Sequence, residues 1–248
     1  MRHLPKPRYL PAGESALVVE FGDTIDPKIH DQVLALDGAV QQANWEGVIE
    51  TVPTYRSLMI HFDSRRLTTE TLIDALTRLE YTSKPPLRRQ QRWHIPTCYD
   101  PPHCEDIVEV AALLGLSSAR IIGLHLGARY RVYMYGFAPG FTLLGGLGGL
   151  PNGLTIPRRA VPRAPAPPGS LLIAGGQALI ASCAMPTGWY GIGRTPVKMF
   201  DPGRERVFLA GIGDELCFER IDPATFDAMS MAAEAGEFCA RHEYLDET

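Results

Sequence analysis

From about residue 129 onward, the sequence consists of short apolar stretches that glycine and proline interrupt at close intervals. In residues 129–135, Arg129, Arg131 and Tyr133 alternate with apolar or aromatic neighbours, which is the period of a half-buried strand. Further strands are expected at residues 170–174, 178–182, 188–192, 206–210 and 215–219. Many short strands at such spacing predict a β-barrel or a β-sandwich.

The first eighty or so residues predict a small α+β unit. A strand is expected at residues 15–21, and Asp26-Pro27 then supplies the N-cap and the first-turn proline of a helix. The remaining elements are strands at residues 48–56 and 57–62 and an amphipathic helix over Leu72, Leu76 and Leu79. The order β-α-β-β-α favours a ferredoxin-like or related split sheet.

A polar, basic and proline-containing stretch at residues 83–92 has no apolar period, and we place a domain boundary there. The chain is therefore expected to be α+β, with an N-terminal α+β domain at residues 1–88 and a barrel domain at residues 89–248. The second domain should also contain two short helices, one ending at Gly115 and one capped by Ser117. A last helix is expected after Asp222.

Charge is distributed unevenly along the chain. The 248 residues have a formal net charge of −4, but residues 110–200 contain no Asp or Glu. This acid-free segment contains eight basic side chains: Arg120, Arg129, Arg131, Arg158, Arg159, Arg163, Arg194 and Lys198. Such a segment suits an anionic ligand or an acidic partner surface, and the alternative is a set of unrelated arginines on a solvated face. The mild acidity of the whole chain argues against a general nucleic-acid binder.

Several function classes lack their motifs in this sequence. The patterns GxxxxGK(S/T), HExxH and GxSxG are absent, and no GxGxxG lies between an expected strand and helix. The glycines of residues 145–149 precede a proline and are expected to form a flexible loop. Five cysteines form no CxxC pair, so we expect reduced thiols and no metal site. No membrane span or signal peptide is expected, which favours a cytoplasmic location.

The candidate site lies in the acid-free segment. A turn at residues 136–141 brings glycine and proline to a strand end, where a backbone can approach a ligand closely. Arginines in a proline-stiffened stretch suit planar carboxylates or phosphates, and a glutamine amide suits amide recognition. The candidate binding residues are Gly136, Phe137, Pro139, Gly140, Phe141, Arg158, Arg159, Gln177 and Arg194. The alternative is that these glycines are barrel turns and that the amide is a surface group.

A single histidine, His125, lies in the acid-free segment and is the candidate catalytic acid or base. A lone histidine is more often structural, and both interpretations stay open at this point. The segment contains no carboxylate that could act as a base or as a Mg²⁺ ligand.

Four motifs in order resemble those of a known family: Gly136-Phe-x-Pro-Gly-Phe, Pro157-Arg-Arg-Ala-x-Pro-Arg, Pro168-Gly-Ser-x-x-Ile-Ala-Gly-Gly-Gln and Gly188-Trp-x-x-Ile-Gly-Arg-Thr-Pro. Gly13-Glu-Ser-Ala-Leu-Val-Val and Val52-Pro-Thr-Tyr-Arg-Ser-Leu are similar to it as well. The chain resembles the 5-oxoprolinase B-subunit family, also called allophanate hydrolase subunit 1 or the sporulation-kinase inhibitor family.

The resemblance implies a small N-terminal α/β domain followed by a cyclophilin-like β-barrel. It also implies that the chain works in a complex with a homologous C-type barrel subunit together with a third, A-type subunit. The implied reaction is the ATP-dependent hydrolysis of 5-oxo-L-proline to L-glutamate. ATP and Mg²⁺ are then expected at the level of the complex, with the chain inactive alone.

The sequence departs from the family pattern at three places near the expected pocket, namely residues 99–104, Thr142-Leu143 and residues 178–182. These differences leave the substrate open between 5-oxoproline and a related amide. Two other functions fit the resemblance. One is a carboxyltransferase-type subunit of a biotin-dependent urea or amide carboxylase in the allophanate pathway, and the other is a non-enzymatic inhibitor of a histidine kinase.

Overall fold

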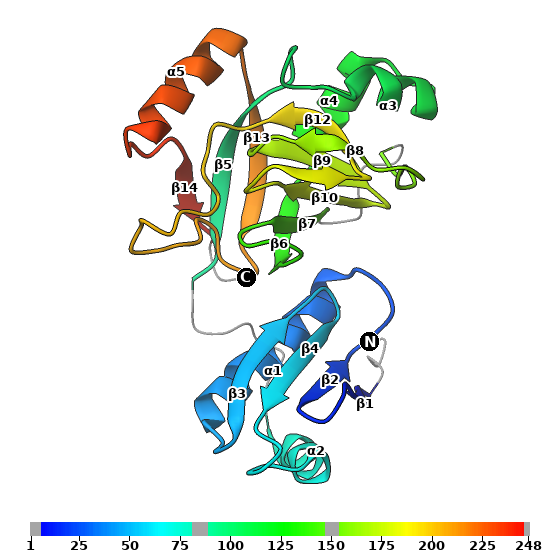
Figure 1. The fold of residues 1–248 in the computed structure, drawn as a ribbon, viewed down its shortest axis with the longest axis vertical. Coiled ribbons are helices and arrows are strands. Elements are labelled where there is room, and N and C mark those ends of the chain that lie inside the picture. Colours follow the sequence, from blue (N-terminus) through cyan, green and yellow to red (C-terminus); the bar gives the residue numbers. More distant parts are fainter. Residues whose placement is uncertain (1–5, 81–88, 147–153, 246–248) are drawn as a thin grey trace. The chain divides into compact units, whose positions relative to one another are not determined.

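The computed structural model describes residues 6–80, 89–146 and 154–245 and divides the chain into two compact units, residues 1–88 and 89–248 (Figure 1). The first unit contains a four-stranded antiparallel sheet with the strand order β1-β2-β4-β3. Its elements are β1 (Arg8–Pro11), β2 (Ala16–Glu20), α1 (Pro27–Ala43), β3 (Val48–Pro53), β4 (Ser57–Phe62) and α2 (Thr69–Arg78).

The expected order β-α-β-β-α is confirmed from β2 to α2. Asp26 is the N-cap of α1 and accepts a hydrogen bond from the Lys28 N–H, and Pro27 occupies the first turn. Val33, Leu36 and Leu72 lie in a core between the helices and the sheet. Strand β1 was not expected, and it pairs with β2 at the edge of the sheet. The ferredoxin-like assignment stays a prediction.

The second unit is a closed β-barrel, as expected. Its strands follow the order β12-β9-β10-β7-β6-β13-β5, and the pairing of Arg194 with Cys98 between β12 and β5 closes the ring. The barrel strands are β5 (Gln91–Cys98), β6 (Tyr130–Tyr135), β7 (Thr142–Gly146), β9 (Ser170–Ala174), β10 (Gln177–Ile180), β12 (Tyr190–Arg194) and β13 (Glu215–Ile221).

Further elements surround the barrel (Figure 1). They are α3 (Ile107–Leu114), α4 (Ser118–Leu126), β8 (Arg163–Ala166), β11 (Met185–Thr187), α5 (Pro223–Glu234) and β14 (Arg241–Tyr244). Strands β8 and β11 pair as a separate ribbon, and β14 adds to β5. Ser117 and Asp222 cap α4 and α5 as expected. Among the described residues, no single helix is long and apolar enough to cross a membrane, although the bent pair α3 and α4 meets the criterion together.

Two expectations about the barrel were wrong. Residues 206–210 form no strand, because Phe208 makes only an isolated bridge to Phe200 and its ring packs on Tyr135. Gly145 and Gly146 were expected in a flexible loop, but they belong to β7 and pair with β6. The rest of that glycine-rich stretch lies outside the described residues.

The carboxylate of Asp106 joins three parts of the barrel unit. It lies buried at the start of α3, where Oδ2 accepts the Gly191 N–H of β12 at 2.7 Å. Its Oδ1 lies 2.6 Å from Arg163 Nη1 and 3.1 Å from Arg159 Nη2. Glu109 and Glu105 add ion pairs to Arg159 and Arg163, respectively. This set, which we call the Asp106 clamp, holds residues 159–163 against α3.

Limited trypsin digestion of the full chain should cleave at Arg88 or Arg89 and leave a stable barrel fragment that begins near Gln90. The sequence between residues 83 and 92 lacks apolar residues at regular spacing and contains basic residues that trypsin recognises. Arg92 should resist, because it lies in β5 and pairs with Glu215. N-terminal sequencing of the fragments checks this, and resistance at both sites would place the boundary elsewhere.

Replacement of Asp106 by Ala should lower the free energy of unfolding by about 1–3 kcal/mol, because it leaves the buried Gly191 N–H without its acceptor and removes one carboxylate from both Arg159 and Arg163. Chemical denaturation measures this. Glu105→Ala is the matched control, since Glu105 is exposed and its loss should change stability by about 1 kcal/mol or less. Equal effects of the two substitutions would show that the Asp106 clamp is not a stabilising unit.

Candidate functional site

A cavity of about 310 Å³ lies against the outer face of the barrel wall. Its floor contains Leu143, Leu179 and Leu172, which are directly opposed on the neighbouring strands β7, β10 and β9. Because side chains alternate along a strand, their neighbours Leu144 and Ala178 point into the barrel core. The pocket is therefore built on the wall of the barrel and does not enter its interior.

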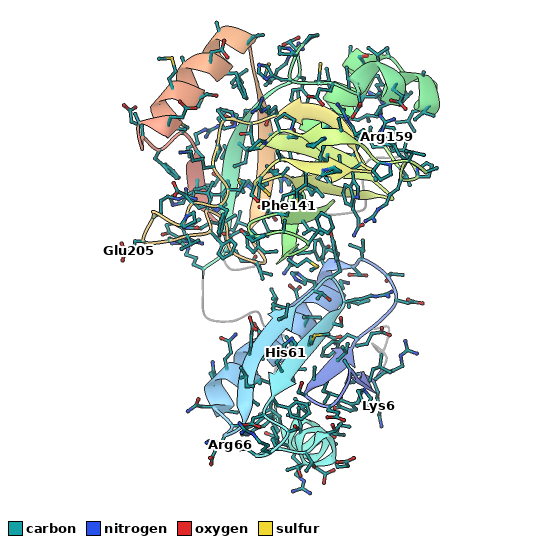
Figure 2. All side chains as sticks on the ribbon, in the orientation of Figure 1. Lys6, His61, Arg66, Phe141, Arg159 and Glu205 are labelled. Atoms are coloured by element: carbon teal, nitrogen blue, oxygen red, sulfur yellow. The ribbon has the colours of Figure 1, made fainter. Side chains whose placement is uncertain are left out.

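Aromatic side chains form part of the pocket walls. Phe137 and Phe141 come from the turn at residues 136–141, with ring centroids 5.8 Å apart, and Trp189 lies on the opposite stretch next to β12 (Phe141 is labelled in Figure 2). Phe137 is 81% exposed and has a φ of 71°, a conformation that costs a side chain of this kind about 1–2 kcal/mol. Strain of this kind is concentrated at functional sites.

Gly140 determines the shape of this turn. Its φ is 77°, and a Cβ there would lie 2.2 Å from the Cβ of Phe200. Only glycine satisfies both conditions, so the turn packs tightly on Phe200 while it presents Phe137 and Phe141 to the pocket.

Two neighbouring arginines line the pocket but differ in charge balance. The guanidinium of Arg159, labelled in Figure 2, is bound by Glu109 and Asp106 and lies 4.2 Å from the Tyr190 ring centroid. The guanidinium of Arg158 lies 5.2 Å from the centroid of the Trp189 ring and forms no ion pair with any described residue. Arg158 is therefore the cation that the pocket offers to an anionic group, in a planar form suited to a carboxylate.

The pocket lining is mostly apolar, and the one thiol among its described residues is that of Cys183. Among the described residues that line it, none is Asp, Glu, His or Lys. The described part of the chain also contains no group of three His, Cys, Asp or Glu side chains that would hold a metal ion. The arrangement can bind a small planar molecule that has an apolar face and an anionic group.

His125 lies in the barrel core and does not line this pocket. It is fully buried, with the Tyr99 hydroxyl 2.8 Å from its Nδ1 and with the rings of Tyr130 and Phe218 packed on its own. Burial lowers the pKa of His125 to about 3, so the imidazole is neutral at physiological pH. This environment favours the structural interpretation over an acid or base role.

Arg194 and Gln177 also lie outside the pocket lining. Arg194 donates from Nε to the Pro168 carbonyl at 2.8 Å, and its guanidinium lies 5.7 Å from the Phe226 ring centroid. Gln177 follows the tight turn between β9 and β10. The structure thus groups Phe137, Phe141, Arg158 and Arg159, while Gly136, Pro139 and Gly140 shape the turn and do not line the cavity.

The leucine floor and the lining residues of the β8–β11 ribbon were not expected from the sequence. The ribbon supplies Ala166, Met185, Pro186 and Thr187. Strands β8 and β11 both contain proline, which is rare inside strands, so the sequence did not indicate that these residues form strands. To predict the leucine floor, one must know the register between neighbouring strands, and short apolar stretches do not specify that register.

Comparison with known proteins shows the family of this chain. The family model described as "Carboxyltransferase domain, subdomain C and D" matches residues 7–210. Three curated relatives are named as the B subunit of 5-oxoprolinase, and the one from Bacillus subtilis is 31% identical over 87% of this chain and 93% of its own length.

Two solved structures extend the comparison. The crystal structure of TTHA0988 is 33% identical, with a TM-score of 0.73 over 84% of this chain, and this chain spans 40% of its length. The urea carboxylase of Kluyveromyces lactis shares the fold at 17% identity, with a TM-score of 0.81 over 97% of this chain and 24% of its own length. The chain belongs to the carboxyltransferase domain family, subdomain C and D, together with the proteins named as the B subunit of 5-oxoprolinase.

Proposed function

We propose that this chain is a subunit of an ATP-dependent 5-oxoprolinase that hydrolyses 5-oxo-L-proline to L-glutamate. It would act in the cytoplasm with a homologous C-type barrel subunit together with a third, A-type subunit. The names of the curated relatives support membership in such a complex, and the match to the Bacillus subtilis relative spans 93% of that protein.

The unpaired guanidinium of Arg158 beside an apolar pocket is the observation that carries this proposal. 5-Oxoproline is a small planar lactam with one carboxylate. Its ring fits between the leucine floor and the aromatic walls, and its carboxylate suits the planar fork of Arg158. Phe137 would close over the ring from the strained turn.

The described pocket residues do not fit Mg²⁺, because none of them has a carboxylate that could bind the metal. They do not fit ATP phosphates either, because Arg158 is the one cation among them without an ion pair. We therefore assign ATP and Mg²⁺ to the complex and route no step of the reaction through this pocket. The chain's own part is to bind and orient the amide substrate. Groups that activate water or the amide would come from a partner protein of the complex.

A second candidate is a carboxyltransferase-type subunit that acts on urea or a related amide with a biotin-dependent partner. The match to the Kluyveromyces lactis urea carboxylase fold favours it. Urea is planar like the lactam but has no carboxylate, so Arg158 would have a smaller role in its binding. The effect of Arg158 on each substrate separates the two functions.

The chain alone should show no 5-oxoprolinase turnover, because the described lining of its pocket contains no carboxylate, histidine or lysine. The measurement is glutamate release from 5-oxoproline with ATP and Mg²⁺, first with the purified chain and then with the two partner proteins added. Turnover by the single chain at enzyme-like rates would contradict its assignment as one part of a complex. Biotin-dependent carboxylation of urea by the complex would favour the second candidate.

Arg158→Ala should lower kcat/KM of the reconstituted complex for 5-oxoproline by roughly 10- to 150-fold, the value of one charge-assisted hydrogen bond. Arg158→Lys should restore part of the loss, since an ammonium cannot reproduce the planar fork. The melting temperature should stay unchanged, because Arg158 is exposed and outside the Asp106 clamp.

Arg159→Ala should instead lower the melting temperature, because it removes an ion-pair partner of Asp106 and Glu109. Arg65→Ala is the surface control, since the one ion-pair partner of Arg65 among the described residues is Asp63 and its side chain is 87% exposed. An Arg158 effect no larger than that of Arg65 would exclude Arg158 from substrate binding.

A further inference from the structure

A second hollow of about 380 Å³ lies within the N-terminal unit, between the end of α1 and strand β3. It is separate from the barrel pocket and plays no part in the proposed reaction. Its lining residues come from one continuous stretch and are Val40, Gln41, Asn44, Trp45, Val48, Ile49, Glu50 and Thr51. Strand β3 is an edge strand of its sheet, and Ile49 on it is 70% exposed. The hollow is therefore open to a ligand from solvent.

The C-terminus of helix α1 gives this hollow a negative potential. The helix has 17 residues, and its peptide dipoles place a partial negative charge at its last turn. Its C-cap is Asn44, which has a φ of 44°, and its last turn contains no basic residue. Helix α2, in contrast, has Arg78 in its last turn. The charge at the end of α1 is thus not compensated within its own last turn.

Hydrogen bonds to Asp37 orient two of the side chains that line the hollow, Gln41 and Thr51. Thr51 Oγ1 donates to Asp37 Oδ1 at 2.5 Å, and Gln41 Nε2 donates to the same oxygen at 3.1 Å. The Oε1 atom of Gln41 consequently faces away from Asp37 and accepts no hydrogen bond from a described residue. Asp37 is half-buried and lies behind the lining, where it fixes both side chains.

The remaining lining groups also favour a positive charge. Glu50 is exposed on β3 and forms no ion pair with a described residue, and the indole of Trp45 adds a π face of the kind that attracts cations. None of the described lining residues is Lys or Arg. The adjacent Glu46 is paired with Arg66 at 3.0 Å, so the uncompensated carboxylate of the hollow is that of Glu50.

We propose that this hollow binds an organic cation, a primary amine or a guanidinium, in contact with Trp45 and Glu50 and with the end of α1. The ligand is either a free small molecule or a lysine or arginine side chain of a partner protein. Both present the same cationic group, and the edge of β3 would add backbone hydrogen bonds only to a peptide.

The test is an NMR titration of the full chain with two guanidinium probes of single positive charge, propylguanidine and N-acetyl-L-arginine methylamide. The chain has three tryptophans, and a Trp45→Phe variant identifies the Trp45 indole signal. We expect that signal to shift with millimolar probe and the effect to weaken as salt is added. N-acetyl-L-citrulline methylamide has the same shape without the charge and should leave the signal in place.

Charge variants make the test specific. Glu50→Gln should weaken binding about twofold to fivefold, and Glu50→Lys should abolish it because the variant supplies its own cation to the hollow. Glu14→Gln is the matched control, since Glu14 is an exposed carboxylate of the same unit that does not line the hollow. Thermal melting verifies that each variant is folded.

The outcomes separate the sources of the cation. Tighter binding of propylguanidine supports a free small molecule, and tighter binding of the amide-flanked arginine supports a partner side chain at the β3 edge. The proposal is overturned if neither probe shifts the Trp45 signal at tens of millimolar. It is also overturned if the citrulline compound shifts the signal equally, or if Glu14→Gln weakens binding as much as Glu50→Gln.

Discussion

The buried carboxylate of Asp106 is the interaction on which the barrel site depends. It accepts a hydrogen bond from the Gly191 N–H of strand β12 and binds Arg159 and Arg163 of the segment 159–163. A buried charge is tolerated when each of its oxygens is paired, and here both oxygens are. Residues 159–163 are held in this way, and Arg158 just before them lies over the Trp189 ring without an ion pair to any described residue.

The Asp106 clamp also reduces the positive charge that the acid-free segment presents to a ligand. Eight basic residues in sequence suggest a broad positive surface, yet the structure neutralises Arg159 and Arg163 with Glu105, Asp106 and Glu109. These three acids stand immediately before the segment begins. Among its described lining residues the pocket therefore presents one arginine without an ion pair within an apolar surface, which suits a small ligand with a single anionic group better than a polyanion.

The sequence predicted the elements whose signals are local. The caps Asp26, Ser117 and Asp222 begin helices as expected, and residues 170–174 form β9 with the predicted bounds. Elements defined by distant partners were missed, as with β7, whose glycines take strand form only through pairing with β6. For the same reason the pattern at residues 206–210 wrongly predicted a strand. The structural and catalytic interpretations of His125 could be distinguished only once its burial by Tyr130 and Phe218 was known.

The pairing of β5 has a consequence for synthesis on the ribosome. Strand β5 opens the barrel unit, yet it lies between β13 and β14, and Arg92 pairs with Glu215 and Glu243. The barrel wall therefore stays incomplete until nearly the whole chain has emerged, whereas the described strands of the first unit are complete by residue 62. Long-range pairing of this kind folds slowly and leaves strand edges exposed meanwhile. The nascent barrel is thus the part of this protein with most need of a chaperone.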